Sequence, residues 1–219
     1  MIPSGEVSWL RWTDPHSLIL ALCQGWRPVG ILATDVTAFL IQHGCPNTAH
    51  HCAAVAVEAA RIATLFGVDS HLAAQAGRLH DVSAVWPAAQ RLSVAQALGL
   101  DILPEERDLP MILHQKLSAI LAEQVFDVRD EAVLSAVSCH TTLKAEASLL
   151  DQVVFVADKL AWDQPAEGPF QPALRAALGV SLQAACRVYL GYLWEQRSRM
   201  EVIHPWTAAA WAEYGISPG

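Results

Sequence analysis

The sequence predicts an all-α fold, and three observations lead to this prediction. The 219-residue chain is 53% hydrophobic, only 16% charged and rich in alanine, a composition that suits closely packed helices better than disorder. Residues that start or stop helices recur at helix-length intervals. No alternation of apolar and polar residues is long enough to predict a strand. A chain of this length can bury one substantial core, so we expect a single compact domain.

The chain divides into an amino-terminal extension and a helical core. Residues 1–33, with Trp9, Trp12 and Trp26, are expected to pack as an extension on residues 34–219, which hold the core and the C-terminal helices. The stretch DQPAEGPFQP is rich in proline and glycine, so it predicts a loop within the core rather than a linker between domains.

The core helices are predicted from their start and stop residues. In chain order, they run from Asn47 or Thr48 to about Phe66 before Gly67, from Ser70 toward Asp81, from Asp108 ahead of Pro110, from Asp130 through DEAVLSAVSCH, from Ser148 to about Trp162, and from Ser181 to Arg199. The most strand-like stretch, VVFVAD, lies inside one of these helix-length segments and is therefore assigned to a helix.

Charge and cysteine content argue against several classes of function. A net charge of −8 disfavours a nucleic acid as the main partner, because lysines and arginines drive binding to its backbone. A small polyphosphate is still a candidate substrate, since metal ions and a few basic side chains can supply local positive charge. The five cysteines show no CxxC pairing, so a reducing cytoplasm fits best. Neither a signal peptide nor a membrane-spanning run is found, and no membrane role is expected.

The adjacent pair His80 and Asp81 is the most informative feature of the chain, because both residues can bind a metal and they end an apolar stretch, LAAQAGRLHD. Burying an imidazole or a carboxylate costs several kcal/mol or so unless the group is paired or bound to a cation. A hydrogen-bonded polar core would explain any one such residue, but for six together a divalent metal is the better explanation. The other four, each set among hydrophobic residues, are His51, His114, His140 and Asp158.

Helical geometry indicates which candidates face inward. His51 shares an apolar stripe with Val55, whereas His50 lies about 100° away around the helix and is the weaker candidate. No basic residue occupies an inward position beside Asp158, because Lys159 projects about 100° away, so a metal is its expected partner. Turns or helix ends explain the remaining histidines, His16, His43, His71 and His204.

The ligand types predict a hydrolytic chemistry. A divalent ion lowers the pKa of bound water and polarises a phosphoryl oxygen, so metal-activated water can attack a phosphate. The best primary ligands are His51, His80, Asp81 and Asp158. Catalytic roles are expected for Asp81, which can bridge two ions or steer the water, and for His114 and His140, which can complete a second metal position or hydrogen-bond the phosphate. The sequence does not decide between these roles, or between a site for one ion and a site for two.

The ordered motifs resemble those of a known family. His51, then His80 with Asp81, then Asp158 follow the signature of the HD-domain superfamily of metal-dependent phosphohydrolases. The segments HCAAVAVEAARIATLFGVD, AGRLHD, LPMILHQKLSA, SCHTT and LLDQVVFVADK follow the order found in YqeK-like HD proteins, and the similarity covers roughly residues 35–200. The core is accordingly expected to be an HD-domain helical bundle.

This resemblance implies a substrate, a ligand set and a metal. YqeK-like proteins are associated with symmetrical hydrolysis of diadenosine tetraphosphate to two ADP at an iron-type or other divalent metal centre. By resemblance, iron is the first choice, while manganese and zinc also suit imidazole and carboxylate ligands. The expected partner is a small nucleotide rather than nucleic acid or membrane, and a homodimer is left open. The implied metal ligands are His51, His80, Asp81, His114, His140 and Asp158.

Basic and aromatic residues near the ligands are candidate substrate contacts. Family members often carry a basic residue before the first histidine and a lysine shortly after the HD pair, but NTAH and HDVSAVWP contain neither. Arg78, Lys144 and Lys159 are candidate phosphate contacts, although a solvated helix surface is the favoured explanation for each. Trp86 and Trp162 are candidates for stacking on a nucleobase, although packing in the core is the favoured interpretation.

The sequence therefore predicts a cytoplasmic HD-domain hydrolase of nucleoside polyphosphates, with diadenosine tetraphosphate as the leading substrate. Two alternatives stay open. The first is a phosphohydrolase that releases phosphate from a nucleoside monophosphate, and the second is a nucleotide-sensing module with a metal site and little turnover. The complete ligand set favours an enzyme, whereas the missing basic positions keep the sensing hypothesis open.

Overall fold

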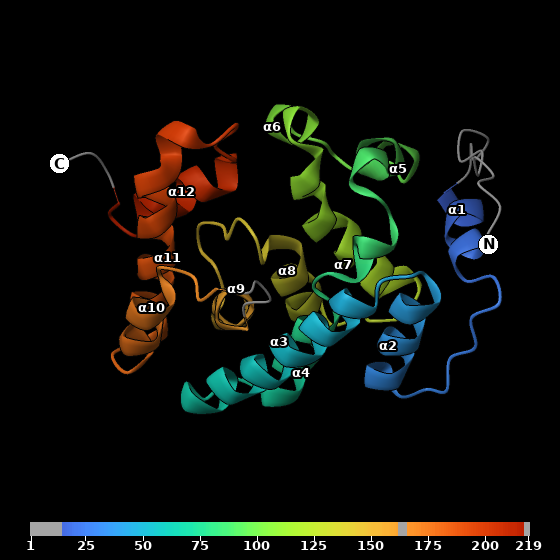
Figure 1. Ribbon diagram of the computed structural model, residues 1–219, viewed down its shortest axis with the longest axis horizontal. Helices are drawn as coiled ribbons and strands as arrows, with labels where there is room; N and C mark the ends of the chain where they lie inside the picture. Colours follow the sequence, from blue (N-terminus) through green and yellow to red (C-terminus); the bar gives the residue numbers. More distant parts are fainter. Residues whose placement is uncertain (1–14, 162–165, 217–219) are drawn as a thin grey trace.

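The computed structural model describes residues 15–161 and 166–216, and all regular elements of these residues are helices, which confirms the all-α prediction (Figure 1). The α-helices are α1 (Pro15–Leu22), α2 (Leu32–Gln42), α3 (Pro46–Leu65), α4 (Ser70–Leu79), α5 (Arg91–Ala97), α6 (Pro104–Asp108), α7 (His114–Gln124), α8 (Glu131–Cys139), α9 (Leu149–Leu160), α10 (Gln171–Leu178), α11 (Leu182–Gln196) and α12 (Pro205–Glu213). Short 3-10 turns are η2 (Val82–Val85), η3 (Ala88–Gln90), η4 (Pro110–Leu113) and η5 (Arg197–Arg199).

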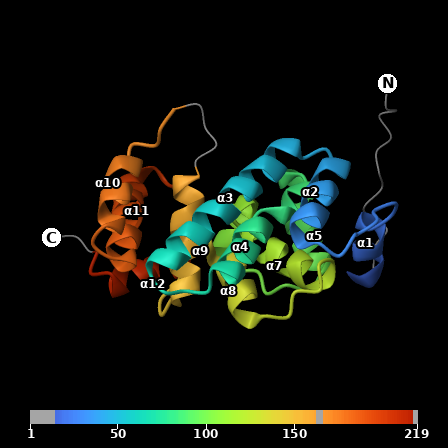
Figure 2. The same ribbon diagram turned by 90° about the horizontal axis from the view of Figure 1, so that it is seen from below.

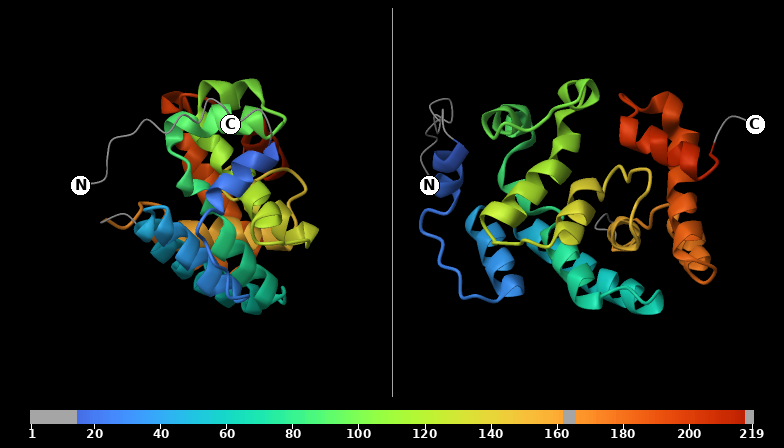
Figure 3. Two further views of the ribbon diagram at one scale, coloured as in Figure 1. Left: turned by 90° about the vertical axis from the view of Figure 1, so that its right-hand side faces the viewer. Right: turned by 180° about the vertical axis from the view of Figure 1, so that it is seen from behind.

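The helices form an elongated bundle whose centre is the pair α3 and α4. Helix α9 packs against both, and α8 joins α7 to α9 (Figure 2). Helices α10 to α12 gather at one end of the molecule, while α1 lies at the other end, as Figures 1 and 3 show from opposite sides. In the described residues, no helix combines the length and the apolar content needed to cross a bilayer.

Side-chain caps define where three predicted helices begin. The Asp130 carboxylate accepts hydrogen bonds from the N–H groups of Ala132 and Val133 at the start of α8. Ser148 caps α9 and Ser181 caps α11 with their hydroxyl groups. Because such oxygens satisfy N–H groups that have no partner inside the helix, these three predicted starts are confirmed.

Two other predicted starts are wrong by one to three positions. Helix α3 begins at Pro46 rather than at a cap formed by Asn47 or Thr48, because proline lacks an N–H and its fixed φ suits the first helical position. Helix α4 is capped by Asp69 rather than by Ser70. The Asp69 carboxylate accepts hydrogen bonds from two backbone N–H groups of the first turn, at 2.8 and 3.0 Å.

The helix start predicted at Asp108 is also wrong. Asp108 ends the short helix α6, Pro110 opens the turn η4, and α-helical bonding begins only at His114. Helices α9 and α11 end at Leu160 and Gln196, shortly before their predicted ends. No start or stop residue predicted α2, α5, α6, α10 or α12. At the N-cap positions of α2, α5, α6 and α10, no side chain accepts a hydrogen bond from the first turn. Helix α12 is capped by the side chain of His204.

The described part of the predicted extension, residues 15–33, lies against the core. The apolar face of α1 is buried, and Trp26 packs edge-on against Phe39 of α2 with ring centroids 5.4 Å apart. Trp9 and Trp12 lie outside the described residues. The division of the chain at residue 33 stays a prediction.

The close approach of α3 and α4 depends on Gly77. A Cβ atom added at this residue would lie 2.9 Å from the Cα of Ala56 and 3.0 Å from the backbone carbonyl carbon of Val55. These neighbours are backbone atoms, which cannot rotate out of the way. Since α3 carries His51 and α4 leads directly into His80, the contact at Gly77 sets how closely two of the candidate ligands approach.

Replacing Gly77 by alanine is expected to lower the free energy of unfolding by about 1–3 kcal/mol, because the added methyl overpacks a backbone contact. Urea denaturation measures this change. The matched control is Gly191→Ala on α11, where an added Cβ meets nothing within 4 Å. That variant is expected to be about 0.5–1 kcal/mol more stable than the unaltered protein. A Gly77→Ala variant as stable as the unaltered protein would contradict the tight contact.

Candidate metal centre

The six predicted ligands lie together where the ends of several helices meet α3. Their side chains form one connected set in which neighbouring polar atoms lie 3.0 to 3.5 Å apart. Their positions are His51 on α3, His80 and Asp81 just after α4, His114 at the start of α7, His140 just after α8, and Asp158 near the end of α9.

Three of these histidines are fixed by the same hydrogen bond. In His80, His114 and His140, Nδ1 donates to the carbonyl oxygen three residues earlier, at 2.8, 2.6 and 2.8 Å. A neutral imidazole that donates from Nδ1 has an unprotonated Nε2, which is an acceptor and a potential metal ligand. The local backbone at three helix ends therefore points three Nε2 atoms toward the centre.

His51, His80 and Asp158 form the first group. The Nε2 atom of His51 lies 3.2 Å from Nε2 of His80 and 3.0 Å from Oδ1 of Asp158, and His80 Nε2 lies 3.4 Å from the same carboxylate oxygen. His51 Nδ1 is buried and has no hydrogen-bond partner among the described residues. Helix α9 thus brings its carboxylate to the pair of imidazoles held by α3 and α4.

Asp81 links this first group to a second one. Its Oδ2 lies 3.5 Å from Nε2 of His80, while its Oδ1 lies 3.5 Å from Nε2 of both His114 and His140. The two Nε2 atoms of the second group are 3.1 Å apart, and the Thr141 hydroxyl lies 2.9 Å from that of His114. One carboxylate therefore bridges the two sets of histidines.

Burial and neighbouring charges set the protonation of the centre. Burial lowers the pKa of His114 to about 4 and also lowers the pKa of His140. For Asp81 and Asp158 burial acts to raise the pKa, but neighbouring imidazoles, and for Asp158 also a lysine, hold it well below its usual range. Near neutral pH His114 and His140 are therefore unprotonated and both carboxylates are ionised. Burial also acts to lower the pKa of His80, but the neighbouring carboxylates of Asp81 and Asp158 hold it well above its usual range.

This donor set fits a divalent metal ion. The facing Nε2 atoms of His114 and His140 carry no proton to share, so their lone pairs repel each other unless a cation lies between them. Ligands bound about 2.1 Å from one ion lie roughly 3.0–3.4 Å from each other, which matches the observed separations. Two triads, His51 with His80 and Asp158, and His80 with Asp81 and His140, each bring three donor atoms within 4.8 Å.

Lys159, a predicted phosphate contact, lies in this centre. Its Nζ donates to Oδ2 of Asp158 at 2.5 Å and to the carbonyl of His140 at 3.0 Å. The prediction that Asp158 has no basic neighbour is therefore wrong, because the flexible lysine stem bends around the helix to reach the carboxylate. The argument for a metal consequently depends on the facing imidazoles rather than on an unpaired Asp158.

Two other predicted contacts, Lys144 and Arg78, contact residues outside the set of six ligands. Lys144 donates to the Ser135 hydroxyl at 2.7 Å, so its charge is engaged elsewhere. Arg78 lines a hollow beside the start of α2 that none of the six predicted ligands lines. Trp86 is only 1% exposed, which supports packing rather than stacking on a ligand. Trp162 lies outside the described residues.

Arg91, which no sequence pattern indicated, supplies a cation close to the centre. Its Nη1 donates to the carbonyl of Met111 at 3.2 Å, and its Nε is buried without a partner among the described residues. Arg91 is close enough to act on the pKa of His114, and Asp81 acts on the pKa of Arg91 in turn. A basic side chain from the start of α5 thus lies near the centre, in addition to Lys159.

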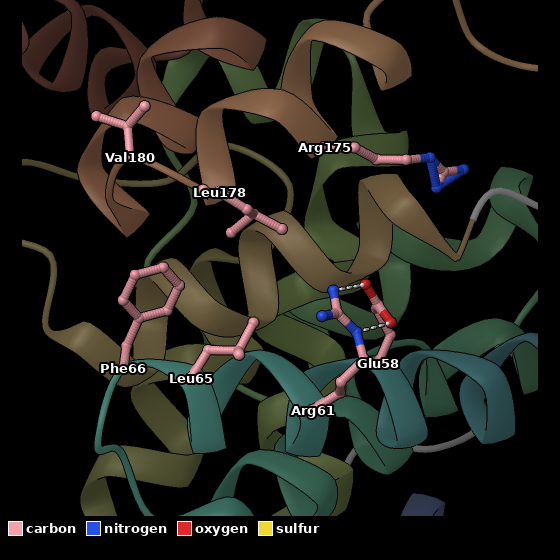
Figure 4. A pocket seen from close by; sticks show the side chains of 8 residues that line it. Glu58, Arg61, Leu65, Phe66, Arg175, Leu178 and Val180 are labelled. Atoms are coloured by element: carbon pink, nitrogen blue, oxygen red, sulfur yellow. Dashed lines mark hydrogen bonds and ion pairs between the residues drawn. The ribbon is translucent and has the colours of Figure 1, made fainter.

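A separate hollow lies away from the metal centre, between the later turns of α3 and the end of α10 (Figure 4). It measures about 700 Å³, and within it Arg61 forms two hydrogen bonds to Glu58. None of the six predicted ligands is among the residues that line it. This hollow therefore offers surface positions for control substitutions that leave the centre untouched.

Comparison with known proteins relates the chain to one family. The HD-domain family model matches residues 48–163. A protein of Lactococcus lactis subsp. cremoris, named an uncharacterized protein in the pepC 5' region, is 44% identical over 62% of this chain and 68% of its own length. The symmetrical bis(5'-nucleosyl)-tetraphosphatase of Staphylococcus aureus is 28% identical over 50% of this chain and 56% of its own length.

A solved structure has a similar fold. It is described as a predicted HD superfamily hydrolase involved in NAD metabolism from Clostridium acetobutylicum, and it superposes with a TM-score of 0.75. The superposition covers 83% of this chain and 95% of the other, at 24% sequence identity. At that identity the likeness concerns the fold alone.

Binding of a divalent metal is expected to raise the melting temperature of the protein, and substitution of His51 by alanine to weaken that effect. Mass action gives about 2.7 kcal/mol of stabilisation at a metal concentration 100 times Kd. Thermal melting with and without Mn²⁺ after chelation measures it. His50→Ala is the matched control, because His50 is exposed on the same helix. Equal metal-induced shifts in the two variants would argue against His51 as a ligand.

Proposed function

Because the chain belongs to the HD-domain family and is an HD-domain hydrolase, we propose that it cleaves diadenosine tetraphosphate symmetrically into two ADP. The observation that carries the proposal is the convergence of the ordered motif residues His51, His80, Asp81 and Asp158 on one centre. The name of the Staphylococcus aureus relative supports this substrate.

The primary ligands of the proposed divalent ion are His51, His80, Asp81 and Asp158, while His114 and His140 would hold a second ion or bind a phosphate oxygen. A bound ion lowers the pKa of a water molecule to near neutral and polarises a phosphoryl oxygen. We propose iron as the metal, with manganese and zinc as the alternatives that this mixture of imidazole and carboxylate ligands accepts.

We propose that Asp81 orients the attacking water. Its side chain is 30% exposed, the largest exposed fraction in the cluster, whereas the side chains of His80 and His140 are at most 2% exposed. Although burial acts to raise the pKa of Asp81, the imidazoles hold it low enough to keep the carboxylate ionised. An ionised, partly exposed carboxylate can accept a hydrogen bond from water and so aim its oxygen at a phosphorus atom.

Two cations flank the centre and offset the charge of a polyphosphate. Lys159 is already bound to Asp158 and the backbone, so it neutralises the carboxylate side of the centre. Arg91 still has a buried Nε–H with no partner among the described residues. A phosphate oxygen is a suitable acceptor for it, because hydrogen bonds between guanidinium and phosphate are charge-assisted. We therefore propose Arg91 as the phosphate contact that replaces the missing lysine.

Product analysis tests the proposed reaction. The metal-loaded protein is incubated with diadenosine tetraphosphate, and the nucleotides are separated by chromatography beside an Asp81→Asn control. We expect ADP as the only product and a loss of at least about a hundredfold in rate for the control, since a positioned group of this kind contributes about 10²–10⁴-fold.

Other product patterns point to other functions. Equal amounts of AMP and ATP would contradict symmetrical cleavage. Release of phosphate from AMP, with no action on the dinucleotide, would support the mononucleotide phosphohydrolase instead. Metal-dependent nucleotide binding without turnover of either compound would support the sensing module.

Substitution of Arg91 by glutamine is expected to lower kcat/KM for diadenosine tetraphosphate roughly tenfold to hundredfold. Loss of one hydrogen bond to a charged group costs about 1.5–3 kcal/mol, which corresponds to this range. Bound metal should be unchanged. Arg175→Gln is the control, since Arg175 is an exposed arginine of the separate hollow in Figure 4. Normal kinetics in the Arg91 variant would exclude a phosphate contact.

A further inference from the structure

A cavity of about 210 Å³ lies beside the metal centre, where the C-terminal helices meet the central bundle. The C-terminal helices form one end of the molecule, beyond α9 in Figure 1. The cavity is lined by residues of η4, by the turn after α8, by α11 and by the segment that joins η5 to α12. Much of its outer wall therefore belongs to residues beyond 48–163, the part of the chain that the HD-domain model matches.

One wall of the cavity is in direct contact with the metal centre. The carbonyl oxygen of Met111 accepts the Nδ1–H of His114 at 2.6 Å, and the hydroxyl of Thr141 lies 2.9 Å from Nε2 of the same histidine. The Nζ of Lys159 lies 5.3 Å from the ring centroid of Tyr189. A ligand in this cavity would consequently lie next to His114 and Lys159.

Another part of the lining carries apolar side chains that are only partly covered, beside the exposed Glu201. Leu193 of α11, Met200 and Val202 are half-buried, so a ligand could still remove apolar surface from water. The chain has three methionines, and both of those beyond residue 1, Met111 and Met200, line this cavity. Methionine sulfur makes favourable contacts with aromatic rings, and its flexible side chain adapts to their shape.

We propose that this cavity binds one nucleobase of the substrate. The assignment rests on the proposed function, because it places the base of a nucleotide whose phosphates occupy the metal centre. A flat aromatic heterocycle suits walls of apolar side chains, methionines and the Tyr189 ring. The ring of Tyr189 is held edge-on by Phe155 and Phe170, with centroids 5.6 and 4.7 Å away, so this wall is formed before any ligand binds.

The size of the cavity limits it to one base. Pockets that enclose drug-sized molecules measure about 300–1,000 Å³, so a cavity of 210 Å³ takes a single heterocycle and leaves the rest of a dinucleotide outside. A base fixed at one end of the phosphate chain determines which phosphate reaches the centre. The distance between the bound base and the metal then selects the phosphate that is attacked, and this selection gives symmetrical products. The second nucleoside needs no pocket.

The test compares ADP with inorganic pyrophosphate, which carries the phosphates without the nucleoside. Titration calorimetry on the metal-loaded protein is expected to show at least about tenfold tighter binding of ADP, since even a small apolar contact in a pocket is worth about tenfold or more. A Val202→Trp substitution, which fills the cavity, should abolish that difference and leave the affinity for pyrophosphate unchanged. The KM for diadenosine tetraphosphate should rise about tenfold in parallel.

Val180→Trp is the matched control, because Val180 is an exposed valine that lines the separate hollow of Figure 4. It should keep the preference for ADP. If Val202→Trp melts at a lower temperature than the unaltered protein, Met200→Ala serves as the second cavity variant. It should weaken the binding of ADP and leave the binding of pyrophosphate unchanged. Equal affinity of the unaltered protein for ADP and pyrophosphate, or an ADP affinity that both cavity variants leave unchanged, would overturn the inference.

Failure of the proposed reaction would look different. A protein that prefers ADP to pyrophosphate through this cavity, yet releases no ADP from diadenosine tetraphosphate, would retain the nucleobase site and lose only the assigned reaction. The calorimetric comparison involves no turnover, so the two results are independent.

Discussion

The hydrogen bond from Nδ1 of a histidine to the carbonyl three residues earlier is the interaction on which the rest of this centre depends. It recurs in His80, His114 and His140, each placed at the end or start of a helix. Donation from Nδ1 leaves Nε2 unprotonated, and three helices aim these lone pairs at one small volume. The pKa values of His114 and His140 are lowered, so their facing lone pairs repel each other and this backbone geometry favours a cation between them.

The packing of the core brings the clustered side chains close to one another. The backbone contact at Gly77 lets α3 and α4 approach closely enough for the Nε2 atoms of His51 and His80 to lie 3.2 Å apart. Lys159 then neutralises one side of Asp158 while the other carboxylate oxygen stays directed at the histidines. Each feature is structural by itself, but together they fix the spacing and the charge of the centre.

An inward-facing helical stripe indicates burial without knowledge of the fold, and it made four of the clustered residues predictable. Asp81 followed from its adjacency to His80 and His140 from its hydrophobic surroundings, while the family resemblance implied all six as ligands. The choice of His51 over the exposed His50 followed from that stripe alone. Two kinds of feature escaped prediction. The reach of Lys159 around its helix depends on side-chain flexibility, and the position of Arg91 depends on the path of two 3-10 turns after the HD pair.

Helices α4 and α8 both end at this centre, since His80 and His140 are their C-terminal capping residues. The aligned peptide dipoles of a helix leave roughly half a negative elementary charge at its C-terminal end. Two such ends add to the negative charge of Asp81 and Asp158, whereas the positive N-terminal end of α7 at His114 and the charges of Lys159 and Arg91 oppose it. A cation is therefore favoured most beside His80 and His140, where the two negative helix ends meet the Asp81 carboxylate.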